Sequence, residues 1–65
     1  MKENYLVNWE IGKSPCGNVV VIGIIYNDTK KRFEDGTKIN TSKVLKADFE
    51  KGIIKTRNSV YSLEI

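Results

Sequence analysis

A chain of 65 residues has room for one domain, and we expect residues 1–65 to form it. One cysteine and no histidine exclude an internal disulfide, a Ser-His or Cys-His catalytic pair and a histidine-ligated metal. The net charge of +3 is no larger than solubility alone requires, so it does not by itself indicate a nucleic-acid-binding protein.

Residues 1–4 show neither the basic nor the apolar stretch of a signal peptide. The longest apolar run, residues 19–26, is much shorter than the about 20 residues that a membrane-spanning helix needs. We therefore expect a cytoplasmic protein with no membrane partner.

The first predicted strand covers residues 5–11, where apolar and polar side chains alternate. Tyr5, Val7, Trp9 and Ile11 occupy the odd positions, so we expect them on one buried face, with Leu6 as the exception. Residues 12–18 collect glycine, proline, serine and asparagine and are predicted to form a loop.

Residues 19–26 carry the densest run of β-branched side chains and form the strongest strand signal. Because the run is apolar on both faces, we expect a central strand that is paired on both edges. Gly23 indicates a bulge, a sharp bend, or a place where another backbone passes close. A bend here would let a small sheet curl into a barrel.

Residues 27–36 are polar and charged apart from Phe33, and are predicted to form a long loop that closes in a turn at Asp35 and Gly36. A short strand over residues 37–40 follows it. The next strands are expected at residues 53–57 and 60–65, separated by the turn residues Asn58 and Ser59.

Residues 42–51 fit two structures. A short helix could begin at Ser42 and end before Gly52. A strand is favoured, because residues 50–52 resemble a hairpin loop with Gly52 in the left-handed conformation, and a clear strand follows.

These elements predict an all-β fold, a meander of five or six short strands, with one short helical turn if residues 42–51 are helical. A meander of this size with a bent central strand fits a small SH3-like or OB-like barrel.

No catalytic arrangement is evident. Glu34 and Asp35 are adjacent, and adjacent side chains on an extended chain point in opposite directions. Cys16 lies in a predicted turn with no helix after it that would activate its thiol. We predict a non-enzymatic protein with no cofactor and no metal site.

Two groups of basic residues could bind an anionic partner. Lys30, Lys31 and Arg32 form a compact cluster in the long loop. The second group would share one face of the hairpin formed by the strands at 44–49 and 53–57, and could meet backbone phosphates, although Asp48 on that face weakens it. Its members are Lys43, Lys46, Lys55 and Arg57. A small nucleic-acid-binding β-barrel is therefore the alternative function.

The first strand carries few charges, which is light protection for a sheet edge. We therefore expect residues 4–11 to form an edge strand that pairs with a second copy or with a target protein. Asn8 and Trp9 within this strand are its candidate partner-binding residues. Trp9 is expected in the core, and would be a natural partner anchor if exposed. Loop residues Lys30, Lys31 and Arg32 would contact the target beside this edge.

The C-terminal half carries a recurrent set of turn and strand residues. It reads Arg32-Phe33-x-Asp35-Gly36-x-x-Ile39-x-Thr41-Ser42-x-Val44 and then Gly52-x-Ile54-x-Thr56-x-Asn58-Ser59-x-Tyr61-x-Leu63. This pattern resembles small uncharacterised proteins encoded by bacteriophages and prophages, and covers about half the chain. The resemblance implies a protein that binds and inhibits or modulates a host protein, including components of anti-phage defence, in the host cytoplasm. It assigns no functional residue.

Overall fold

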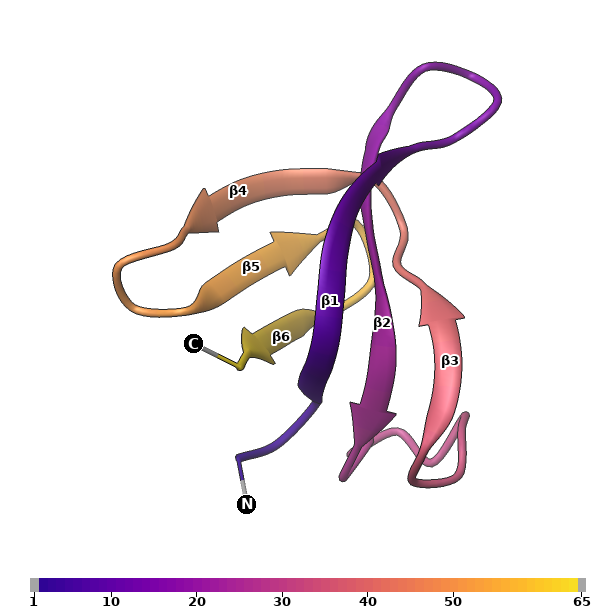
Figure 1. Ribbon diagram of the computed structural model, residues 1–65, viewed down its shortest axis with the longest axis vertical. Helices are drawn as coiled ribbons and strands as arrows, with labels where there is room; N and C mark the ends of the chain where they lie inside the picture. The colour runs from indigo at the N-terminus through magenta and orange to yellow at the C-terminus, as the bar shows by residue number, and fades with distance from the viewer. Residues whose placement is uncertain (1, 65) are drawn as a thin grey trace.

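The computed structural model describes residues 2–64, which form a single sheet of six strands without a helix (Figure 1). In chain order the strands are β1 (Tyr5–Lys13), β2 (Val19–Tyr26), β3 (Thr37–Asn40), β4 (Val44–Asp48), β5 (Ile53–Thr56) and β6 (Val60–Leu63). The all-β prediction is confirmed. Residues 42–51 contain strand β4, so the helical alternative for this segment is wrong.

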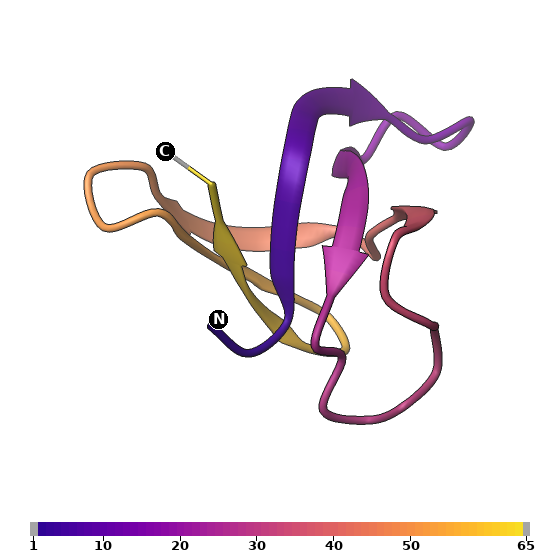
Figure 2. The ribbon, with the colours of Figure 1, turned by 60° about the horizontal axis from the view of Figure 1, so that its bottom comes forward.

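The spatial order of the strands is β3-β2-β1-β6-β5-β4. Each half of the chain is an antiparallel meander, and the halves meet where β1 runs parallel to β6 over Tyr5↔Ser62 and Leu6↔Leu63. Figure 2 shows the two three-stranded halves crossing one another. The sheet is mixed and open, with β3 and β4 at its edges, so a closed barrel of SH3-like or OB-like type is not established.

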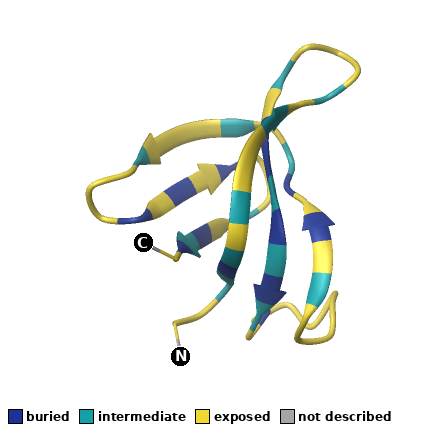
Figure 3. Ribbon diagram, in the orientation of Figure 1, coloured by how far each residue is buried: buried dark blue, intermediate teal, exposed yellow. Residues whose placement is uncertain are grey.

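The core lies between the two halves. Every strand except β4 gives it a buried side chain, and Figure 3 shows buried and exposed residues alternating along β5. Trp9 and Val44 pack against its margin. The buried apolar residues are Leu6, Val21, Ile25, Ile39, Ile54, Tyr61 and Leu63.

Strand β1 contains a bulge that changes which residues face the core. Its register with β2 shifts between Val7 and Glu10, and Asn8 in between has a φ of +49°. The extra residue reverses the inward and outward alternation. Leu6 is consequently buried before the bulge and Trp9 packs on the core after it, while Val7 faces the other side. The prediction that Tyr5 and Val7 share the core face with Trp9 and Ile11 is wrong for this reason.

Gly23 lies directly against the bulge. A Cβ at this position would come within 3.1 Å of the Trp9 Cβ, 3.2 Å of the Val7 carbonyl oxygen and 3.3 Å of the Trp9 Cα. Of the three alternatives for Gly23, the close passage of another backbone is confirmed. The bend of β1 and its fit onto β2 therefore depend on glycine at this position.

Three further expectations are settled by the pairing. β2 has a strand on each side, as predicted. Gly52 has a φ of +66° in the β4–β5 turn, also as predicted. The prediction that β1 is an edge strand is wrong for Tyr5 and Leu6, which lie between β2 and β6, because the C-terminal strand returns beside them.

We predict that Gly23→Ala destabilises the fold by about 2 kcal/mol or more, because alanine fits the backbone conformation but its methyl group collides with strand β1. Gly17→Ala is the matched control. Gly17 has a φ of +86° and open space around it, so its substitution should cost only about 1 kcal/mol of backbone strain. Urea unfolding of the two variants measures the difference, and equal losses would contradict the role assigned to the bulge.

Candidate functional site

The loop between β2 and β3 folds around the carboxylate of Asp28, whose side chain is fully buried. This carboxylate accepts hydrogen bonds from the backbone N–H groups of Arg32 at 2.8 Å, Phe33 at 3.2 Å and Lys30 at 3.3 Å. It also forms a salt bridge with Arg32, with 3.2 Å between Oδ1 and Nη2. One buried anion thus holds three residues of the loop in place, namely Lys30, Arg32 and Phe33.

Burial raises the pKa of Asp28, but the hydrogen bonds and charge of Arg32 and the Lys30 N–H outweigh burial and hold this pKa below its ordinary value of 3.8. The hydrogen bond to Asp28 correspondingly raises the pKa of Arg32. Because the folded-state pKa of Asp28 is the lower one, ionised Asp28 stabilises the fold at neutral pH. That contribution is lost as the pH falls below 3.8 and through the folded-state value.

The predicted cluster of Lys30, Lys31 and Arg32 is largely engaged within the fold. The Lys30 ammonium donates to the Asn58 carbonyl, and the Arg32 guanidinium reaches the Tyr61 hydroxyl at 3.4 Å. Both bonds tie the loop to the β5–β6 region, while exposed Lys31 extends from a residue with a φ of +54°. The structural role of Asp28 was missed from the sequence, although an aspartate that begins a polar loop is a known turn signal.

Asn8 and Trp9 both lie beside Glu64, the residue that follows β6. The Trp9 indole N–H donates to the Glu64 carbonyl at 2.6 Å, and its ring stacks on Phe49 with 5.9 Å between centroids. Trp9 is half-buried against the core, as expected, whereas Asn8 is exposed at the bulge. Loop residue Lys30 contacts the Asn58 carbonyl before β6, whereas Trp9 contacts the Glu64 carbonyl after it.

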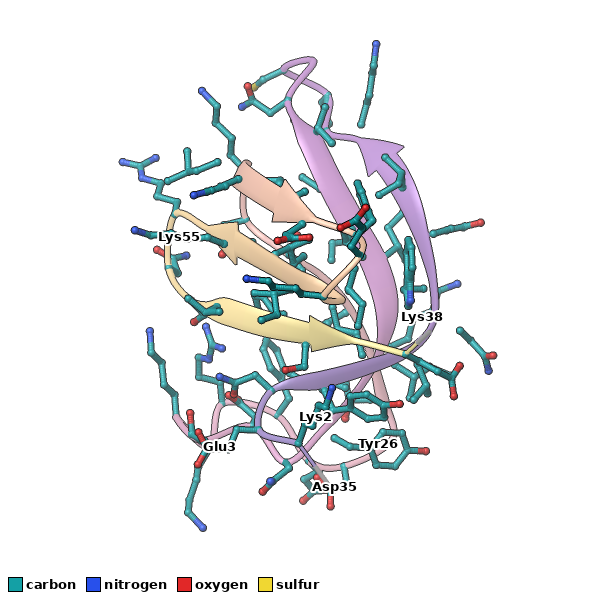
Figure 4. All side chains as sticks on the ribbon, turned by 90° about the vertical axis from the view of Figure 1, so that its left-hand side faces the viewer. Lys2, Glu3, Tyr26, Asp35, Lys38 and Lys55 are labelled. Carbon is teal, nitrogen blue, oxygen red and sulfur yellow. The ribbon has the colours of Figure 1, made fainter. Side chains whose placement is uncertain are left out.

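The second basic group is brought together along β4 and β5. Lys46 and Lys55 are direct cross-strand partners, and the Arg57 N–H donates to the Lys43 carbonyl at 3.0 Å. All four side chains are exposed. Figure 4 views the molecule from the side of β4, β5 and β6 and labels Lys55.

A shallow groove lies on the same outer face. It is lined by Lys46, Asp48, Ile53, Lys55 and Val60, and we call it the outer-face groove. Ile53 and Val60 are 41% and 51% exposed within it. Asp48 is the groove's acidic residue, and its Oδ1 accepts the Lys51 N–H at 3.2 Å in the hairpin turn. The groove thus presents apolar contact area flanked by two lysines.

Groups of three or more His, Cys, Asp or Glu side chains that could hold a metal are not found among residues 2–64. Cys16 is exposed in the β1–β2 loop. Within the same described part, no helix is long and apolar enough to cross a membrane. Comparison of the chain with protein-family models, curated proteins and solved structures found no match.

We predict that Asp28→Asn destabilises the fold by about 2 kcal/mol or more at pH 7, because it leaves the Arg32 guanidinium without its buried counter-charge. Glu34→Gln, in the same loop and with an exposed side chain, should change stability by no more than about 0.5 kcal/mol. Thermal unfolding at several pH values checks both. The gap between wild type and Asp28→Asn should narrow below pH 3.8, and a gap that persists there would contradict the assigned charge effect.

Proposed function

We propose that this chain is a non-enzymatic binding protein whose outer-face groove docks an acidic and apolar surface of a partner protein. The observation that carries the proposal is the exposure of Ile53 and Val60 beside the paired lysines Lys46 and Lys55. Exposed apolar area rimmed by charged side chains is typical of protein interaction sites.

The electrostatics of this face favour an acidic partner. Like charges directly opposite one another on paired strands are destabilising, and Lys46 faces Lys55 in this way. Asp48 directs one carboxylate oxygen to the backbone of the hairpin turn, which reduces its capacity to compensate the two ammonium groups. Carboxylates of a partner placed between the lysines would relieve the repulsion while an apolar side chain covers Ile53 and Val60.

The resemblance of the C-terminal half to small bacteriophage and prophage proteins suggests the biological setting. In this proposal the chain is phage- or prophage-derived, acts in the host cytoplasm and inhibits or modulates a host protein, such as a component of anti-phage defence. The matching residues are turn and strand positions, so the resemblance supports the setting and not the groove.

We expect the tagged wild-type protein to capture a host protein from bacterial lysate after nuclease treatment, and the double variant Ile53→Ser/Val60→Ser to lose it. The matched control is Ile11→Ser/Val19→Ser, which removes similarly exposed side chains from β1 and β2. Quantitative pull-down with identification of the captured protein measures the effect. Equal capture by both double variants would refute docking at the groove.

A second candidate function is nucleic-acid binding, favoured by the alignment of Lys43, Lys46, Lys55 and Arg57 along one hairpin. Small SH3-like or OB-like barrels are common frames for such binding, and an open six-stranded sheet of this size could serve in the same way. Stacking aromatics would strengthen this function. Tyr61, however, is buried, and Phe33 lies in the β2–β3 loop under the Arg32 guanidinium.

If the second function holds, affinity for a short oligonucleotide should fall steeply with added salt, because phosphate contacts release counterions. Lys46→Gln/Lys55→Gln should then reduce affinity and flatten the salt dependence by about two unit charges. Lys2→Gln/Lys38→Gln, which removes the same charge elsewhere, is the control. Fluorescence anisotropy measures the wild type and both double variants, and equal binding by the two variants would exclude the second basic group as the nucleic-acid site.

A further inference from the structure

Strand β1 is paired on both sides only in its first part. β6 accompanies it at Tyr5 and Leu6, and the last bond of this ladder runs from the Glu64 N–H to the Leu6 carbonyl at 2.8 Å. Beyond the bulge, residues 10–13 pair with β2 alone. This part of β1, with β2 and the loop at residues 14–18, projects past the rest of the sheet (Figures 1 and 2). We call it the projecting ribbon, residues 10–21.

The direction of the backbone groups on this ribbon follows from β2. The Val21 N–H donates to the Thr41 hydroxyl at 3.0 Å, and the Val21 carbonyl accepts the Thr41 N–H at 2.8 Å. Val21 therefore turns its polar groups away from β1. Because Ile11 is its cross-strand partner, the pair is a non-hydrogen-bonded one, and Ile11 points its N–H and carbonyl away from β2.

The same alternation places the N–H and carbonyl of Lys13 on this side. No strand within residues 2–64 pairs with the ribbon there, so the half of β1 beyond the bulge is a free edge.

We propose that this free edge pairs with the same edge of a second copy, antiparallel and about a two-fold axis at Ile11. Two Ile11 residues would then exchange both backbone hydrogen bonds, and the two sheets would become one. The apolar surface supports this pairing, because Ile11 is 51% exposed on the core-side face of the ribbon. A continuous sheet would cover part of that area.

Charge excludes two of the possible registers, and apolar contact between the two isoleucines favours the axis at Ile11 over the remaining one at Gly12. Only residues that direct their N–H and carbonyl groups outward can form the new hydrogen bonds. An axis between two successive residues would pair an outward-directed residue with an inward-directed one, so the axis must pass through a residue. An axis at Glu10 sets two carboxylates opposite each other, and an axis at Lys13 sets two ammonium groups opposite each other. An axis at Gly12 places Ile11 against Lys13 of the second copy.

With the axis at Ile11, the isoleucines face each other and Glu10 faces Gly12 of the second copy. Lys13 faces Trp9 of the second copy, where its ammonium can lie against the indole ring. No like charges meet in this register. A second copy is therefore an occupant that the sequence of this edge accepts without repulsion, independently of whatever binds the outer-face groove.

Proline substitution tests the edge without breaking the β1–β2 ladder, because the N–H of Ile11 does not take part in it. We expect wild type to dimerise reversibly in sedimentation equilibrium below about 1 mM, and Ile11→Pro to weaken the dimer at least about tenfold. Val19→Pro is the matched control. Val19 sits on the opposite edge of the same ribbon and, as the partner of Lys13, also points its N–H away from the ladder.

A wild type that stays monomeric at about 1 mM would overturn the proposal, as would equal weakening by the two proline variants. If Ile11→Pro fails to fold, Ile11→Lys replaces it with Val19→Lys as its control, because the axis would then set two lysines opposite each other. The register is tested separately in a Cys16→Ser background. Ile11→Cys should oxidise to a linked dimer faster than Val19→Cys, and the reverse order would place the contact on the other edge.

Discussion

The contact between Gly23 and the bulge of β1 is the constraint on which the rest of this fold depends. With no side chain at Gly23, the backbone of Trp9 can lie against β2, and β1 accommodates one extra residue there. The extra residue turns Trp9 toward the core, where its indole bonds the Glu64 carbonyl and stacks on Phe49. The same bulge ends the pairing with β6 after Leu6 and leaves the projecting ribbon with a free edge.

The two halves of the sheet share only a short parallel pairing, so side chains must hold them together elsewhere. Asn4 is central, since its amide donates to the Val60 carbonyl at 3.1 Å and accepts the Thr29 N–H at 2.9 Å. Lys30 and Arg32 reach across to Asn58 and Tyr61. The charge of the long loop suggested that it binds a partner. Its contacts show that it connects the two halves of the sheet, and the buried Asp28 carboxylate holds its backbone in place.

Local patterns predicted much of this structure. The bounds of β2 follow from a run of β-branched residues, and the pairing of Lys46 with Lys55 follows from a hairpin whose turn requires Gly52 at positive φ. What failed depends on residues far apart in the chain. A bulge that requires Gly23 determines which face of the sheet Leu6 lies on. The return of β6 beside β1 determines that Tyr5 lies between two strands and not at an edge. The alternation of apolar and polar side chains over residues 5–11 indicates neither feature.

The basic residues differ in whether their side chains bond within the fold or remain exposed on its surface. Arg32 donates to the Asp28 carboxylate and Lys30 to the Asn58 carbonyl. Lys46 and Lys55 instead lie opposite one another on the outer face, where two like charges lower the stability of the fold. A domain of 65 residues has only roughly 3–5 kcal/mol of net stability, and an exposed like-charge pair of this kind costs it at most about 1 kcal/mol. A partner that neutralises the pair recovers that free energy on binding, and binding to the folded state alone stabilises it further. In the two proposals, relief of the electrostatic repulsion on the outer face and pairing of the open backbone edge on the projecting ribbon would supply binding free energy separately.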